Sequence, residues 1–171
     1  MSNAKKVKEL MVEITDYPHI PYWMSVRDAI FMMQSVYAAT SEHRLLLVFD
    51  ERYQLQGVLT LKDLITGIEP RFLRKEETPR YQGLTHPDRT RLAVLVEGAF
   101  SEKCKEEAKK PVGEVMTPIR ATVDADDSIA KAIFVMLQAD VDLIPVMDGG
   151  KVAGVLRMGD VFNELTKIVI E

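Results

Sequence analysis

The sequence lacks the features that mark secreted and membrane proteins. Cys104 is the only cysteine in 171 residues, so no internal disulfide can form, which suits a reducing compartment. No apolar run approaches the roughly 18 residues that a membrane-spanning helix needs. Lys5, Lys6 and Lys8 are not followed by the apolar stretch of a secretory signal. We therefore expect a cytoplasmic protein without membrane contact.

The sequence also lacks a basic surface and a metal-ligand cluster. Its net charge is −4, and residues 67–110 hold 10 of the 22 Lys and Arg but 8 of the 26 Asp and Glu, which leaves 12 basic against 18 acidic residues elsewhere. Nucleic-acid binding usually requires a basic face, so we expect no nucleic-acid partner. His19, His43 and His86 are isolated, and no nucleophile–base pair is evident. We expect no metal, no required cofactor and no enzymatic activity.

One sequence pattern occurs twice in the chain. It combines S-[IV]-x-x-A-I-F-x-M with an apolar run that ends in Asp and with G-V-L-x-x-x-D. The first copy runs from Ser25 to Asp63, and the second runs from Ser128 to Asp160. Two copies of one small unit indicate that neither half of the chain should be interpreted alone.

Each copy predicts the element order β-α-β-β-α. Ser25 and Ser128 stand where a hydroxyl can cap the first turn of a helix, and apolar residues at the spacing of one helix face follow both serines. The runs 45–49 and 143–147 are short, apolar and flanked by turn residues, as buried strands are. A strand is also expected before each helix, at about 19–22 and 120–123, and residues 148–151, with Gly149 and Gly150, predict a hairpin turn.

The pattern also predicts where the parts of the chain begin and end. Ser2-Asn3-Ala4 resembles an expression-vector scar. Residues 70–87 are rich in Pro, Arg and Glu, which predicts a loop, and Asp88 can cap a helix that Pro111 stops. We expect an N-terminal tail at 1–6, repeat 1 at 7–68, a linker at 69–110 with loop 70–87 and helix 88–109, and repeat 2 at 111–171.

These residues resemble a tandem pair of CBS domains, the regulatory modules named after cystathionine β-synthase. In the second repeat V-G-E-V-M-T-P from Val112 to Pro118, L-I-P-V-M-D from Leu143 to Asp148, and G-V-L from Gly154 fit the family pattern closely. The first repeat has Leu47 where the family has Pro. Its G-V-L-T-L-K-D, however, is the fuller match to G-V-[VIL]-[ST]-x-x-D.

The resemblance implies a fold, a class of ligand and a mode of assembly. The fold is α+β, with two β-α-β-β-α repeats packed about a pseudo-two-fold axis and, in this chain, an extra helix in the linker between them. Clefts between the repeats bind adenosine nucleotides (AMP, ADP, ATP or S-adenosylmethionine) as regulatory ligands. Such proteins usually pair two modules as a homodimer and act on another protein, whose identity the sequence does not give.

The same resemblance assigns ligand-binding roles to particular residues. A carboxylate in the first turn of a helix can accept hydrogen bonds from ribose hydroxyls, and a hydroxyl three residues earlier can reach phosphate oxygens with the helix amides. Thr60 and Asp63 fit this pattern, although Thr60-x-x-Asp63 is also a capping box that needs no ligand. The other residues assigned to the clefts are Asp160, Arg157, Arg44, Thr122, Ile144 and Pro145.

Arg157 stands where the family has Ser or Thr, and two alternatives remain open for it. It can supply a positive charge to a phosphate, or it can lie across an unused cleft and pair with Asp160. The first alternative suits a sensor of adenosine nucleotides. The second suits a structural dimerisation module whose clefts are empty or self-filled.

Overall fold

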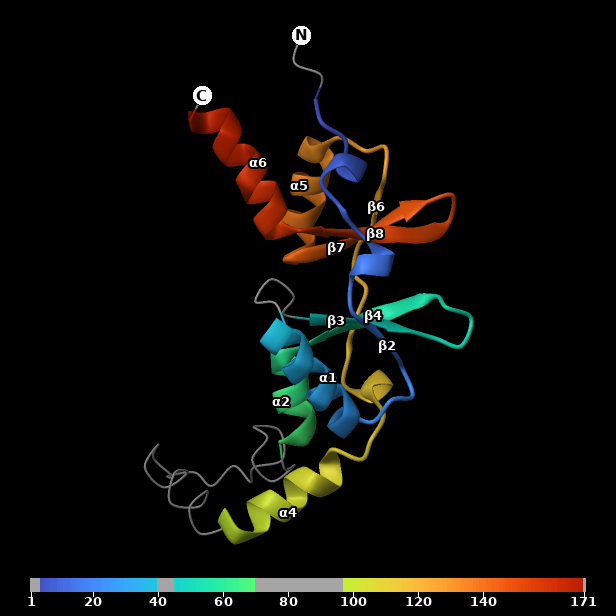
Figure 1. Ribbon diagram of the computed structural model, residues 1–171, viewed down its shortest axis with the longest axis vertical. Coiled ribbons are helices and arrows are strands. Elements are labelled where there is room, and N and C mark those ends of the chain that lie inside the picture. The colour runs from blue at the N-terminus through green and yellow to red at the C-terminus, as the bar shows by residue number, and fades with distance from the viewer. Residues whose placement is uncertain (1–3, 40–44, 70–96, 171) are drawn as a thin grey trace, which may run out of the picture. The chain divides into compact units, whose positions relative to one another are not determined.

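The computed structural model describes residues 4–39, 45–69 and 97–170 (Figure 1). Within these residues the chain forms an α+β fold with two four-stranded sheets and five α-helices, which confirms the predicted fold class. The chain divides into two compact units. We call residues 1–21, 46–58 and 118–171 the first unit, and residues 22–45 and 59–117 the second unit.

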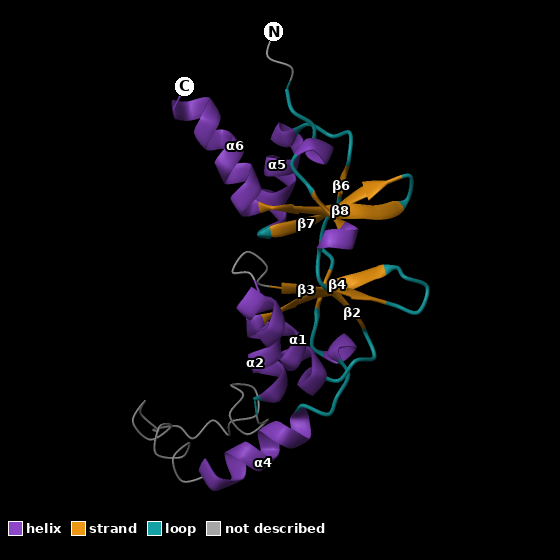
Figure 2. Ribbon diagram, in the orientation of Figure 1, coloured by secondary structure: helices purple, strands orange, loops and turns teal. Residues whose placement is uncertain are grey.

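The first unit contains one complete sheet and two helices. Strand β6 runs parallel to β7, whereas β7 and β1 both run antiparallel to β8, so the strand order is β1-β8-β7-β6 (Figure 2). The elements are β1 (Val12–Glu13), β6 (Val123–Asp124), α5 (Ile129–Ala139), β7 (Leu143–Asp148), β8 (Lys151–Arg157) and α6 (Met158–Ile170).

The second sheet has the strand order β2-β3-β4-β5, with β2 parallel to β3. Helices α1 and α2 of the second unit contact each other, and α2 also contacts α4. The elements are β2 (His19–Pro21), α1 (Val26–Ala39), β3 (Leu45–Phe49), β4 (Leu55–Thr60), α2 (Leu61–Ile68), α4 (Glu97–Glu107) and β5 (Thr117–Pro118).

The local signals of the sequence are confirmed. The Ser25 hydroxyl accepts a hydrogen bond from the Asp28 N–H (3.1 Å), and the Ser128 hydroxyl accepts one from the Lys131 N–H (3.2 Å), so both predicted helix caps form. Gly149 and Gly150 take φ values of 58° and 79° in the β7–β8 turn. A glycine accepts these values without steric cost.

The opening segment of each repeat is bonded to the other repeat. The Val7 N–H donates to the Asp127 carbonyl (2.9 Å), and in the second unit the Val112 N–H donates to the Met24 carbonyl (2.8 Å). Strand β1 likewise pairs with β8 of repeat 2, and β5 joins the sheet of β4. The two repeats therefore exchange their first strands, a feature that the sequence pattern does not predict.

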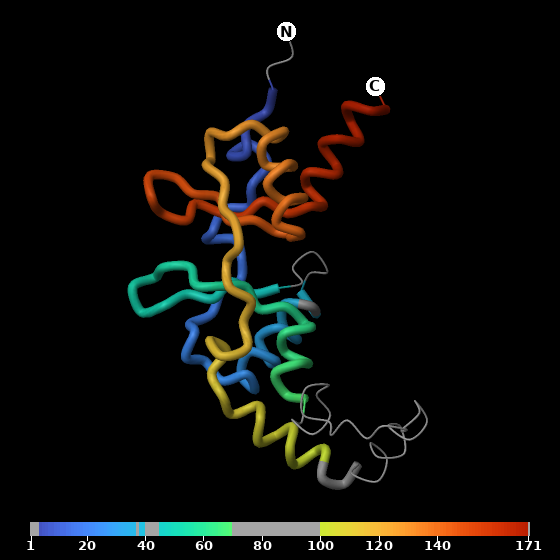
Figure 3. Tube along the Cα trace, turned by 180° about the vertical axis from the view of Figure 1, so that it is seen from behind, coloured from blue at the N-terminus to red at the C-terminus, as the bar shows by residue number. Residues whose placement is uncertain are grey.

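This exchange accounts for the largest difference from the predicted strands. A strand was expected at 120–123, but β6 covers Val123–Asp124 and residues 119–122 are irregular. The reason is that these residues connect β5, in one sheet, with β6, in the other, as the chain trace in Figure 3 shows. The predicted loop 70–87 and the predicted helix start at Asp88 lie outside the described residues, and the helix is described from Glu97 to Glu107.

The hydrophobic core of the first unit joins α5, the central strands and the N-terminal segment. Its members are fully or almost fully buried, and three of them lie on α5. They are Val7, Val123, Ala125, Ile129, Ala132, Met136, Ile144, Val146, Leu156 and Val161. Because Val7 belongs to this core, the N-terminal segment is an integral part of the unit that contains repeat 2.

Candidate functional site

Thr60 and Asp63 form a capping box at the start of α2. Thr60 ends β4 with extended backbone angles, and its hydroxyl accepts a hydrogen bond from the Asp63 N–H (3.1 Å). The Asp63 carboxylate accepts one from the Thr60 N–H through Oδ2 (2.9 Å). The local sequence thus fixes both side chains at the end of a buried strand, where the helix dipole favours negative charge.

A third residue completes this cluster. The Thr117 hydroxyl of β5 donates to Asp63 Oδ1 at 3.0 Å, across 54 positions of the sequence. An ionised carboxylate offers about four acceptor positions, and the bonds from Thr60 and Thr117 take two of them. Sequence reasoning assigned no role to Thr117. Its place in the M-T-P motif at the start of repeat 2 was the available signal.

The equivalent position in the second repeat is filled differently. The Arg157 guanidinium binds the Asp160 carboxylate through two bonds, Nε to Oδ2 at 2.6 Å and Nη2 to Oδ1 at 2.9 Å. The two side chains are 20% and 23% exposed. Of the two alternatives for Arg157, the structure therefore contains the ion pair with Asp160.

Tyr17 lies in the same unit, and the charge of Arg157 affects the pKa of its phenol. Burial raises the pKa of the Tyr17 phenol to about 12, while the Arg157 charge acts in the opposite direction. The phenol is therefore neutral at physiological pH. Arg157 thus acts on the neutral Tyr17 phenol while its guanidinium engages both oxygens of Asp160.

The structure describes three of the four remaining predicted site residues. Ile144 and Pro145 are buried in β7, and Ile144 belongs to the core cluster. Thr122 is exposed and lines a separate cavity near the β-hairpins. Arg44 and the neighbouring His43 lie outside the described residues.

In residues 4–39, 45–69 and 97–170, no group of three His, Cys, Asp or Glu side chains is placed to hold a metal ion. No helix in the described part of the chain combines the length and hydropathy needed to cross a bilayer.

Solved structures of similar fold cover nearly the whole chain. CBSX2 in complex with AMP is 22% identical, with a TM-score of 0.61, and the match covers 95% of this chain and 97% of that chain. CBSX2 from Arabidopsis thaliana is 19% identical, with a TM-score of 0.66 and 99% coverage of both chains. A CBS domain-containing protein from Kribbella flavida is 14% identical, with a TM-score of 0.70 and coverage of 95% and 99%.

The sequence comparisons give the family. No curated protein matches the chain. The family model of the CBS domain matches it twice, at residues 7–69 and 112–167. Both segments contain one copy of the repeated pattern, and the solved structures share the fold. The chain therefore belongs to the CBS-domain family, as a tandem pair of CBS domains.

Proposed function

We propose that this CBS pair is a non-enzymatic sensor that binds an adenosine nucleotide at Thr60, Asp63 and Thr117 and signals to a partner protein. The observation that carries the proposal is the Asp63 carboxylate, which is half-buried in the first turn of α2 and held by two neutral donors. Two of its acceptor positions remain for the two hydroxyls of a ribose. Hydrogen bonds to an ionised carboxylate are among the stronger ones.

The capping box is compatible with this role. The Thr60 hydroxyl accepts from the Asp63 N–H through its oxygen, so its own hydrogen can still be donated to a phosphate oxygen. The free N–H groups of the first turn of α2 also favour an anion. The cap therefore holds donors and acceptors in place before a ligand arrives, which lowers the entropic cost of binding.

Signalling requires that the ligand bind one arrangement of the protein better than another. Asp63 belongs to repeat 1, whereas Thr117 belongs to the opening segment of repeat 2. A nucleotide that contacts both residues would tie this exchanged segment to α2. We propose that a partner protein binds differently to the chain when the nucleotide holds this segment against α2.

The choice of ligands to test follows from the relatives. The CBSX2 structure contains AMP, and the ribose contacts proposed for Asp63 are common to AMP, ADP, ATP and S-adenosylmethionine. We expect at least one of the four to raise the melting temperature. A ligand at 100 times its Kd adds about 2.7 kcal/mol, which corresponds to roughly 5–10 °C for a chain of this size.

The test compares Asp63→Ala with the matched variant Asp160→Ala. We expect Asp63→Ala to abolish the nucleotide-dependent shift and Asp160→Ala to retain it, because Arg157 already occupies the Asp160 carboxylate. Each variant is first melted without ligand, so that a loss of folding is not mistaken for a loss of binding. A shift that survives in Asp63→Ala and disappears in Asp160→Ala would place the nucleotide in the wrong repeat for this proposal.

We also propose that the module is a homodimer. Phe31 of α1 and Phe134 of α5 occupy equivalent positions in the two repeats, and they are 57% and 63% exposed. Ile65 and Leu137 add exposed apolar surface on α2 and α5. A second copy with the same faces would bury these rings. Phe31→Asp with Phe134→Asp should convert the dimer to a monomer in analytical ultracentrifugation, and an unchanged mass would contradict the proposal.

A purely structural dimerisation module is the second candidate function. The observation that favours it is the Arg157–Asp160 ion pair, which fills one of the two equivalent positions. If no nucleotide changes the melting temperature while the protein sediments as a dimer, this second function is supported and the sensor is not.

A further inference from the structure

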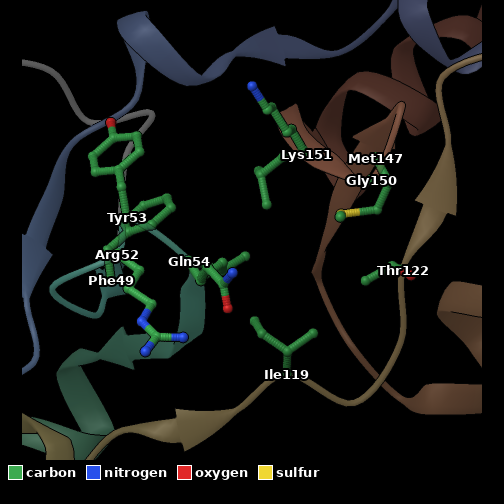
Figure 4. Close-up of a pocket in the computed structure, with 11 residues that line it drawn as sticks. Phe49, Arg52, Tyr53, Gln54, Ile119, Thr122, Met147, Gly150 and Lys151 are labelled. Atoms are coloured by element: carbon green, nitrogen blue, oxygen red, sulfur yellow. The ribbon is translucent and has the colours of Figure 1, made fainter.

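The first unit contains a cavity that the nucleotide proposal does not use. It lies between the β3–β4 hairpin and the β7–β8 hairpin and has a volume of about 640 Å³ (Figure 4). Leu55, the first residue of β4, lines it, whereas Thr60 is the last residue of that strand. Small-molecule sites typically enclose about 300–1,000 Å³, so the cavity is large enough for a ligand.

One wall of the cavity is a turn with a preset shape. The Asp50 carboxylate accepts hydrogen bonds from the Arg52 N–H (2.9 Å) and the Gln54 N–H (2.8 Å). Tyr53 between them has a φ of 58°, a conformation that side chains other than those of Gly, Asn and Asp rarely adopt. The corresponding turn of repeat 2 meets the same demand with Gly149 and Gly150. Repeat 1 instead places a large aromatic side chain there.

The Tyr53 ring is held by two neighbouring residues, Phe49 and His19. It stacks on Phe49 with the ring centroids 4.6 Å apart and the planes at 11°, and its hydroxyl lies 3.0 Å from His19 Nε2. His19 Nδ1 lies 3.0 Å from the Tyr17 carbonyl. Because a carbonyl only accepts, Nδ1 carries the hydrogen, and in the neutral ring Nε2 accepts from Tyr53. The ring is thus fixed while 59% of Tyr53 stays exposed.

The charges around the cavity have one sign. Among the described residues that line it, Arg52 and Lys151 are cationic and none is acidic. Asp50, behind the turn, is already engaged by backbone amides and by the Gln56 side chain at 2.9 Å. Figure 4 shows Arg52 coming from one hairpin and Lys151 from the other. Two long cationic side chains at the rim favour an anion.

The other walls are apolar with a few polar groups. Ile119 and Met147 contribute apolar surface, and Thr122 and Gln54 contribute hydrogen-bonding groups. In Figure 4, Tyr53 and Phe49 lie on one side of the space and Met147 and Thr122 on the other. An apolar body with few polar contacts is the usual composition of a small-molecule site.

We propose that this cavity binds a small aromatic anion. The planar apolar part of the ligand lies against Tyr53 and Phe49, and its phosphate or carboxylate group contacts both Arg52 and Lys151. The chemistry differs from that at Asp63, where a carboxylate accepts hydrogen bonds from hydroxyl groups. The two sites therefore recognise different parts of a molecule and can be tested separately.

The experiment uses 1-naphthyl phosphate as the probe, with 1-naphthol and inorganic phosphate as its two halves. We expect the whole probe to bind at least tenfold more tightly than either half in isothermal titration calorimetry. Arg52→Gln and Lys151→Gln should each weaken its binding about tenfold, because each removes a charge-assisted contact. Lys103→Gln makes the same charge change on exposed α4 and should leave the affinity unchanged.

Tyr53→Asn tests the aromatic wall without disturbing the turn, because asparagine tolerates a positive φ. It should keep the melting temperature within a few degrees and weaken the probe at least fivefold. The proposal is overturned if 1-naphthyl phosphate does not bind, if 1-naphthol binds equally well, or if Lys103→Gln weakens binding as much as Lys151→Gln does. Tenfold weaker binding of the probe to Asp63→Ala would also overturn it, because the probe would then occupy the site at Asp63 and not this cavity.

Discussion

Asp63 and Asp160 occupy the same position in the two repeats, but their partners differ in charge. Asp63 is held by a backbone amide and a threonine hydroxyl, and Asp160 is held by the fork of a guanidinium. Neutral donors leave the negative charge available to a ligand, whereas a bidentate cation neutralises it. The difference between Thr60 and Arg157 at equivalent positions therefore leaves one carboxylate with neutral partners and gives the other a cationic partner.

The hairpins differ in a complementary way. Repeat 2 turns on Gly149 and Gly150, and repeat 1 turns on Arg52 and Tyr53. The repeat in which Asp63 has neutral hydrogen-bond donors thus also carries side chains at its hairpin tip. Repeat 2 has the partly buried Arg157–Asp160 ion pair at the position of Thr60 and Asp63, and it has glycines without side chains at its hairpin tip.

The largest effect is expected at Gly154, where β8 meets the exchanged strand β1. A Cβ at this position would collide with the Val12 carbonyl. Gly154→Ala should therefore lower the free energy of unfolding by about 3 kcal/mol, measured by urea denaturation. Gly159→Ala is the control, because a Cβ there meets no atom within 4 Å and alanine favours a helix by about 0.5–1 kcal/mol.

Gly57 holds the equivalent position in β4 and is buried. If the two repeats exchange strands equally, Gly57→Ala should be nearly as destabilising as Gly154→Ala. A Gly57→Ala protein as stable as the wild type would show that the exchange matters in one repeat alone.

The second prediction removes the charge difference between the two carboxylates. Arg157→Thr gives repeat 2 the T-x-x-D sequence of repeat 1. The loss of a partly buried ion pair should cost about 1–2 kcal/mol of stability. At the same time, the number of nucleotides bound per chain should rise from one to two in titration calorimetry. A stoichiometry that stays at one would mean that more than Arg157 closes the second position.

A smaller and equal effect is expected at the two helix caps. The Ser25 and Ser128 hydroxyls make the same bond at 3.1 and 3.2 Å. Ser25→Ala and Ser128→Ala should each cost about 1 kcal/mol in urea denaturation. The double variant should cost their sum, because the caps lie in separate helices. A difference of more than about 0.5 kcal/mol between the single variants would extend the asymmetry to the helix starts.

The smallest effect is expected on the stability of the protein at acidic pH. Hydrogen bonds from Lys8, Lys131 and Lys5 lower the pKa values of three carboxyl groups in the first unit, Asp126, Asp127 and Glu164 respectively. A carboxyl whose pKa is lower in the folded state stabilises the fold above its unfolded pKa, about 3.9 for Asp and 4.3 for Glu. That stabilisation is lost as the pH falls through the lower folded value.

The urea midpoint should therefore decrease between roughly pH 5 and pH 3. Lys8→Gln should make this decrease shallower, because it removes the main cause of the Asp126 shift. Lys109→Gln, on the exposed surface of the second unit, should leave the pH dependence unchanged. Equal pH profiles for wild type and Lys8→Gln would mean that Asp126 contributes nothing to acid stability.

Local sequence signals predicted much of the fold. The serine caps, the buried runs at 45–49 and 143–147 and the glycine turn at 149–150 all depend on neighbouring residues, and all are present in the structure. The exchange of β1 and β5 depends on pairing between distant segments, which leaves no local pattern in one sequence. The positive φ of Tyr53 was likewise not predictable, since the residue type argues against it.

The candidate site was predictable in part. The T-x-x-D motif indicated Thr60 and Asp63, and the sequence reduced Arg157 to two alternatives, of which the structure contains one. It did not indicate Thr117, because its bond to Asp63 forms only when the exchanged strand is in place. The hairpin cavity depends in the same way on two turns that are far apart in the sequence.

The exchanged strand β1 also constrains synthesis of the protein. The partner of Val12, Val155 in β8, is synthesised more than 140 residues after it. At 5–20 residues per second this delay is roughly 7–30 s. During that time β1 has no native partner, and the nascent chain presents an unpaired strand to chaperones and to neighbouring chains.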